Sequence, residues 1–209
     1  MIKAKLRATF FALSLPLLLN ATHILKDDIL KPEVSKIINT IGDELFTKTG
    51  INGYVIATNE HFPVGFNLVE YSKRYSKQMT QPFVLFIFAP QAKITLKSEA
   101  TGRVGLIPSS KEIKSLYDYE GVMDSAVGVV SVQDKNTPED KDNIGVLQAF
   151  SELADNIASS KGVELENTLP NETRKVVWVL KVLVYFGSLF VLWIFILRPL
   201  YMRIKNGKQ

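Results

Sequence analysis

The chain has 209 residues, a formal net charge of +4, two histidines and no cysteine, so disulfides, thiol catalysis and cysteine-ligated metal centres are excluded. The charge is unevenly distributed: all 21 acids lie between Thr22 and Thr173 with only 15 of the 25 bases, which leaves this middle segment at −6. An acidic middle segment repels phosphate backbones, and we therefore expect no nucleic-acid partner.

Residues 1–21 have the layout of an export signal. Lys3, Lys5 and Arg7 precede the apolar run Ala8–Leu19, which is short for a membrane span but typical of a signal peptide. Ala21 offers the small residue that a signal peptidase requires, so we expect cleavage after it. The alternative is that the same segment stays attached as an uncleaved N-terminal anchor.

After a lead-in over residues 22–31, the sequence predicts an exported α/β domain over residues 32–162. Pro32 suits the first turn of a helix, and Gly50 is a natural stop for it. Tyr54–Ala57 is a short apolar run between turn residues and predicts a strand. The apolar positions that give the first helix its spacing are Val34, Ile37, Ile38, Ile41 and Leu45.

The next stretch predicts a helix and two strands. Asn67 caps a helix that runs to about Met79, and Phe83–Phe88 is apolar throughout, as in a strand covered on both faces. A turn at Pro90–Ala92 then leads to an alternating strand over Lys93–Lys97. We expect these last two strands to form an antiparallel hairpin, and the two earlier strands to pair in parallel through a helical crossover.

The following part is expected to contain a loop and short helices. Ala100–Pro108 contains two glycines and predicts a loop, after which Ser109 caps a short helix. Gly121–Val132 fits a helix better than a strand, although both patterns are present. Gln133–Asp142 is highly charged and predicts an exposed loop.

The last helix of the domain is expected to begin at Asn143 and to stop near Gly162. Residues 163–175 form a polar linker. The linker leads to Val176–Leu197, which contains no proline, no acid and one base. At ~1.5 Å per residue this stretch reaches across the ~30 Å apolar core of a bilayer, so it predicts a transmembrane helix.

The basic tail over residues 198–209 sets the orientation of this span. Basic residues concentrate on the cytoplasmic side of membrane spans. We therefore expect a single-pass protein of the bacterial inner membrane, with its main domain in the periplasm and its C-terminus in the cytoplasm. The topology-determining residues are Arg198, Arg203, Lys205 and Lys208.

Three residues of the span are candidates for contact with a partner. Lys181 lies about one turn inside the outer interface, where it either extends its amine outward or pairs with an acid of another transmembrane helix. Gly187 and Ser188 are small residues at mid-span and would let a neighbouring helix approach closely.

The order of elements resembles the TPM-domain family over roughly residues 30–162. The resemblance is carried by Phe46–Gly50 with Tyr54–Ala57, by Phe83–Pro90, by Ile94–Leu96 and by Gly145–Leu153. It implies a small mixed β-sheet flanked by helices on both faces. A signal peptide at the start and one span at the end are common in that family.

Two functions are compatible with this sequence. The first is a non-enzymatic accessory, assembly or scaffold subunit, which binds an integral membrane or periplasmic protein complex and needs no cofactor. The second, implied by the resemblance, is a metal-dependent phosphatase. Its Ca²⁺ or Mg²⁺ would be held by carboxylates, the ligands that such hard cations prefer. The candidate metal ligands are Glu99, Asp118, Glu120 and Asp124.

Overall fold

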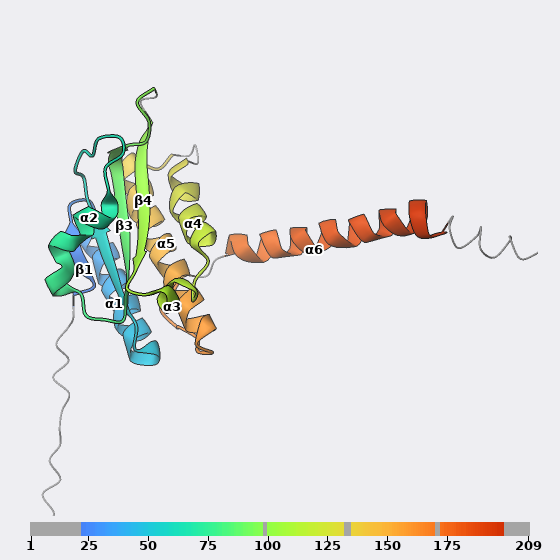
Figure 1. Ribbon diagram of the computed structural model, residues 1–209, viewed down its shortest axis with the longest axis horizontal. Helices are drawn as coiled ribbons and strands as arrows, with labels where there is room; N and C mark the ends of the chain where they lie inside the picture. Colours follow the sequence, from blue (N-terminus) through green and yellow to red (C-terminus); the bar gives the residue numbers. More distant parts are fainter. Residues whose placement is uncertain (1–21, 98–99, 132–134, 170–171, 199–209) are drawn as a thin grey trace, which may run out of the picture.

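The fold is a mixed α/β domain followed by a long C-terminal helix (Figure 1). The computed structural model describes residues 22–97, 100–131, 135–169 and 172–198. Its sheet has four strands in the order β1-β2-β3-β4, with β1, β2 and β3 parallel and β4 antiparallel to β3. The expected mixed sheet is confirmed, and so is the parallel pairing of the strands predicted at Tyr54–Ala57 and Phe83–Phe88, which are β2 and β3. The strands are β1 (Ile24–Asp27), β2 (Asn52–Ala57), β3 (Phe83–Lys93) and β4 (Thr101–Pro108).

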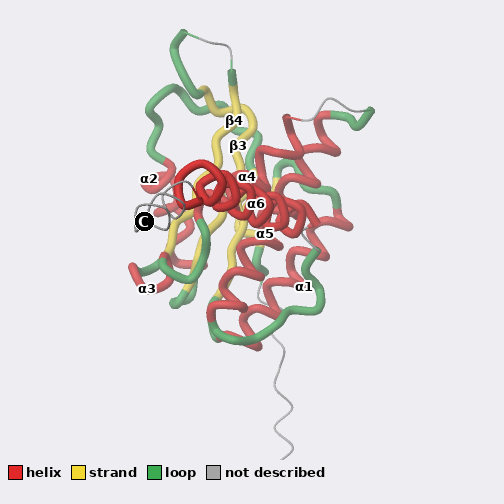
Figure 2. Tube along the Cα trace, turned by 90° about the vertical axis from the view of Figure 1, so that its right-hand side faces the viewer, coloured by secondary structure: helices red, strands yellow, loops and turns green. Residues whose placement is uncertain are grey.

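Helices cover both faces of the sheet, as expected. Along β2 the side chains alternate: Val55 and Ala57 belong to one buried cluster, and Tyr54 and Ile56 belong to another. The first and larger cluster packs against α1, α4 and α5, and the second packs against α2 (Figures 1 and 2). The helices are α1 (Pro32–Thr49), α2 (Leu68–Ser72) with the 3₁₀ helix η1 (Lys73–Gln78), α3 (Lys111–Lys114), α4 (Tyr119–Ser131) and α5 (Pro138–Ser160).

The first helix forms for the reasons that its sequence indicates. Pro32 occupies its first turn, and Gly50 ends it at φ 73°, a left-handed conformation that suits glycine. The amide of Gly50 donates to the carbonyl of Phe46 at 2.7 Å, which satisfies one of the last orphan acceptors. Ile38 and Ile41 are fully buried on the sheet side.

The prediction that residues 22–31 are only a lead-in is wrong, because this stretch contains the edge strand β1. His23 explains why this short strand is held in place. It is fully buried, with ring nitrogens 2.8 Å from the carbonyl oxygen of Gly53 and 3.2 Å from a carboxylate oxygen of Asp43. Gly42 makes room for the ring, since a Cβ at this position would overlap the ring atoms.

The expected turn at Pro90–Ala92 and strand over Lys93–Lys97 are also wrong. β3 continues to Lys93, and its antiparallel partner is Thr101–Pro108, the stretch that we expected to be a loop. Pro90 cannot donate to a ladder, but the register is irregular between Ala89 and Lys93, and this irregularity accommodates it.

Two helix starts differ from expectation. Ser110, not Ser109, caps α3 by accepting the amide of Ile113, whereas the hydroxyl of Ser109 accepts the amide of Phe83. Helix α5 begins at Pro138 rather than Asn143, so the expected loop over residues 133–142 is shorter. The ambiguous stretch is helical from Gly121 to Ser131 in α4, as favoured, and Val132 lies outside the described residues.

The C-terminal part contains helix α6 (Glu172–Leu192) and the π-helical turn η2 (Trp193–Leu197). Helix α6 leads away from the side of the domain that carries α4 and α5 (Figure 1), and Figure 2 looks nearly along its axis. Within the part of the chain that the structure describes, no helix combines the length and the hydropathy that a membrane span requires.

The fit between Gly42 and His23 yields a stability prediction. Gly42→Ala should destabilise the domain by about 1–3 kcal/mol, because the new methyl group overlaps a buried ring that is held by two polar contacts. Gly128→Ala is the matched control: this glycine also lies in a helix, with nothing within 4 Å of the position a Cβ would take, so alanine there should stabilise slightly. Urea unfolding of residues 22–169 measures both changes. Equal stability of the two variants would contradict this packing.

Candidate interaction site on the C-terminal helix

Helix α6 and turn η2 expose a nearly continuous apolar surface. Twelve large apolar side chains between Leu183 and Leu197 are 43–72 % exposed, with Leu192 and Leu197 lowest and Phe195 highest. Isolated exposed apolar residues are common on soluble proteins, but contiguous ones mark a binding or lipid-facing surface. This part of the chain is therefore the first candidate for a functional surface.

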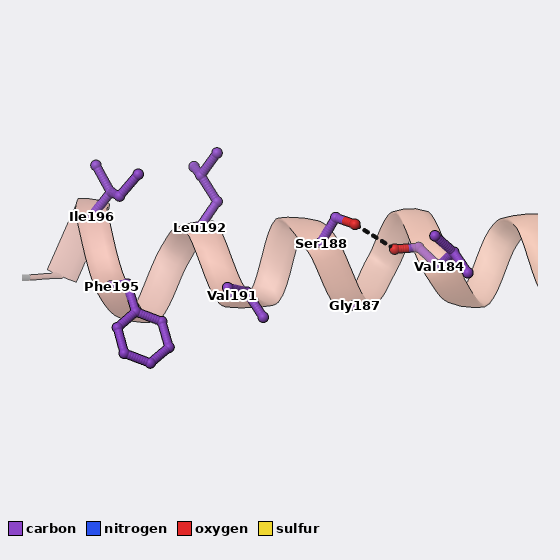
Figure 3. A pocket seen from close by; sticks show the side chains of 7 residues that line it. All are labelled: Val184, Gly187, Ser188, Val191, Leu192, Phe195 and Ile196. Carbon is purple, nitrogen blue, oxygen red and sulfur yellow. Dashed lines mark hydrogen bonds between the residues drawn. The ribbon is translucent and has the colours of Figure 1, made fainter.

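One face of this helix is shallowly grooved. Gly187 and Ser188, both predicted contact residues, lie at its centre (Figure 3). Gly187 has no heavy atom within 4 Å of the position a Cβ would take, and the Ser188 hydroxyl donates to the Val184 carbonyl at 2.8 Å. The serine hydroxyl is thus satisfied within its own helix and leaves the groove apolar. The residues lining the groove are Val184, Gly187, Ser188, Val191, Leu192, Phe195 and Ile196.

The other residues expected to act at the membrane are only partly described. The side chain of Lys181 lies outside the described part of the chain, as do Arg203, Lys205 and Lys208. Arg198 is exposed immediately after η2. The structure therefore places one of the four bases that we expect to set the topology directly after the apolar helix.

Three of the four candidate metal ligands, Asp118, Glu120 and Asp124, are exposed acids around the start of α4. Asp118 accepts the amide of Glu120 at 3.2 Å, an ordinary helix-start contact, and Asp124 is exposed one turn further on. Among the described residues, no group of three histidines or acids is arranged to hold a metal ion. Glu99 lies outside the described residues, so the four-carboxylate site stays a prediction.

Sequence reasoning missed a polar cluster where strands β1 and β2 end. Lys26 forms ion pairs with Glu60 and, at 3.1 Å, with Asp28, and the Tyr71 hydroxyl donates to Glu60 at 2.8 Å. The Lys26 amine lowers the pKa of Glu60. Burial raises the pKa of Tyr71. These groups form hydrogen bonds and ion pairs with one another, so we interpret the cluster as a structural link between β1 and the loop after β2.

A second missed feature is the carboxylate of Glu44 on α1. It accepts the amides of Glu166 and Asn167 at 2.7 and 3.0 Å and the Asn167 side-chain amide at 2.8 Å. Lys48 forms an ion pair with it at 2.8 Å. Burial opposes ionisation, but these donors together lower the pKa of Glu44 to about 2. The expected linker over residues 163–175 is therefore partly docked on the domain.

No protein-family model matches the chain, and no curated protein matches it in sequence. The class of the protein, a mixed α/β domain with a C-terminal apolar helix, therefore rests on the geometry described above.

The Glu44 contacts predict a pH-dependent contribution to stability. A carboxylate whose folded pKa is lowered stabilises the fold above its unfolded pKa of 4.5, and this stabilisation is lost as the pH falls toward 2. Glu44→Gln should thus lower the free energy of unfolding by roughly 1–2 kcal/mol at pH 7 and by progressively less below pH ~4. Denaturant unfolding at several pH values measures the difference.

Glu164→Gln is the matched control, because Glu164 is an exposed acid in the same segment. Its effect should be within about 0.5 kcal/mol at every pH. A Glu44→Gln effect that stayed constant from pH 7 to pH 2 would contradict the role assigned to the carboxylate.

Proposed function

We propose that this protein is a membrane-anchored accessory or assembly subunit of a larger inner-membrane complex, with a TPM-like domain in the periplasm. The apolar stretch Val176–Leu197 crosses the bilayer, and its Gly187–Ser188 face receives a transmembrane helix of the partner. The protein acts by protein–protein interaction rather than by catalysis.

The exposed apolar side chains of α6 and η2 are the observation that carries this proposal. Twelve large apolar residues remain exposed there. Burying them in lipid or against a partner would stabilise the protein by on the order of 20 kcal/mol, since each such side chain contributes about 1.5–3 kcal/mol. No other described part of the chain leaves a comparable surface uncovered.

The groove supports a helix as the partner. Association of helices in lipid depends on close packing, and small residues permit the backbones to approach. Gly187 leaves open space on this face, and Ser188 satisfies its own hydroxyl, so an apolar helix can lie against both without leaving a polar group unpaired. The groove is about three helical turns long, from Val184 to Ile196.

Substitutions in the groove test the proposal. Gly187→Leu should remove a stoichiometric partner from a mild-detergent pull-down of the full-length protein, because the added side chain fills the groove. It should not disturb the chain itself, since nothing lies within 4 Å of the position a Cβ would take. Leu189→Phe is the control, because it adds volume outside the groove-lining set.

Two results would count against the proposal. Recovery of the wild-type protein without any companion would remove the accessory role, and solubility of the full-length protein without detergent would remove the anchor. Phosphatase turnover by residues 22–169 with Mg²⁺ or Ca²⁺, lost in Asp124→Asn, would replace the proposal with the enzymatic alternative.

A further inference from the structure

The segment between α5 and α6 is a strap that lies on the domain. We define the strap as residues 163–169. Gly162 reverses the chain at φ 73°, and the strap then returns along α5 from its C-terminal end toward its middle. Contacts along this path hold it at several points, so the strap is docked on the domain, whereas the sequence predicted only a polar linker.

Glu44 holds the middle of the strap. Its carboxylate is 10 % exposed and receives three hydrogen bonds from Glu166 and Asn167. The amine of Lys48 closes the arrangement by donating to the Glu164 carbonyl at 2.9 Å. Hydrogen bonds to a charged group are about twice as strong as neutral ones. The pKa of Glu44, lowered to about 2, keeps the carboxylate ionised near neutral pH.

The end of the strap is fixed as firmly as its middle. The Thr168 hydroxyl donates to Asp155 at 2.7 Å, and the amide of Leu169 donates to the Ser151 hydroxyl at 2.8 Å. Leu165 and Leu169 pack against the larger hydrophobic core. The strap is therefore part of the domain up to Leu169, which lies beside the middle of α5.

Only two residues separate Leu169 from Glu172, the first residue of α6. Whatever their conformation, the Cα atoms of Leu169 and Glu172 are at most ~11 Å apart. Four helical residues, ~6 Å, then lead to Val176, where the apolar stretch begins. The headgroup layer on each side of a bilayer is itself ~5–8 Å thick. A span that begins at Val176 therefore leaves the Leu169 region within about 10 Å of the headgroups.

We propose that the strap holds the α5 side of the domain against the lipid headgroups, so that the domain keeps one orientation on the membrane. This inference rests on the proposed membrane anchor. The surface concerned is centred on Gln148, which is exposed on α5 one turn before Ser151. Ile144, 36 % exposed one turn earlier, extends it. Helix α6 leads away from the side of the domain that carries α4 and α5 (Figure 1).

Fluorescence quenching in vesicles tests the orientation. The chain contains no cysteine, so Gln148→Cys and Lys77→Cys each provide a single labelling site in the full-length protein. Lys77 lies in η1, which follows α2 on the opposite face of the sheet. The protein is reconstituted into phosphatidylcholine vesicles that contain a headgroup-linked nitroxide. The far face of a domain of this size lies about 30 Å further from the bilayer, so the label at 148 should be quenched several-fold more.

A lengthened tether serves as the decisive variant, because it leaves the domain's own contacts intact. An insertion of about twelve Gly and Ser residues between Leu169 and Glu172 adds a mean span of ~20 Å, which lets the domain rotate freely. Quenching at 148 should then fall to nearly the value at 77. Glu44→Ala should lower the difference partly, and Glu164→Ala should leave it unchanged.

The outcomes separate this inference from the proposed function. If the full-length protein fails to float with the vesicles, the anchor itself is wrong. If it floats but the two labels are quenched equally, the anchor stands and the fixed orientation is wrong. A difference that survives the long insertion would also overturn the role of the strap, because some other contact would then hold the domain.

Discussion

The burial of helix α5 is the constraint on which the rest of the structure depends. From Asn143 to Ala158 nearly every residue of this helix is buried. Phe150 and Leu153 belong to the larger core that lies against the sheet. Gly145 allows α4 to come so close that a Cβ there would lie 2.8 Å from the Ala126 carbonyl oxygen. With α1, α4 and the sheet around it, the remaining side of α5 is where the strap docks.

Sequence periodicity predicted the elements that bury one clear face and missed those that depend on pairing. Helix α1 and strands β2 and β3 follow from their own apolar spacing. Strand β1 does not, because Ile24–Asp27 is short and half charged, and it is held by its pairing with β2 and by the contacts of His23. Strand β4 contains Gly102 and Gly105, which suggest a loop. Gly105 nevertheless suits the strand, because a Cβ there would lie 3.1 Å from the Leu68 side chain of α2 and would require that side chain to shift.

The part of the candidate site that lies within one continuous stretch of sequence could be predicted, and the part formed by long-range contacts could not. The apolar stretch and its small residues, Gly187 and Ser188, are visible in a window of about twenty residues. The Glu44 contacts join residues 122 and 123 positions apart, so no local pattern could indicate them. The sequence predicted a polar linker, whereas polar groups of the strap bind the domain and its two leucines pack against the core. The docking of the strap could not be predicted from its composition, because its hydrogen-bond partners are distant in sequence.

The strap and the groove together have a geometric consequence for the proposed accessory role. A residue of an α-helix is rotated by ~100° from the previous one, so positions along α6 keep fixed directions relative to its first turn. Because only two residues separate the strap from that first turn, the proposed anchor keeps the Gly187 groove within a short distance of the domain. Under the proposed function, a partner whose helix is seated in the groove also lies within reach of the domain outside the membrane. With a long flexible linker, the contact in the membrane and the contact with the domain would form independently. Each contact would then cost its own loss of conformational entropy. Under the proposed function, the short connection would therefore allow one interaction in the membrane and one outside it to reinforce each other.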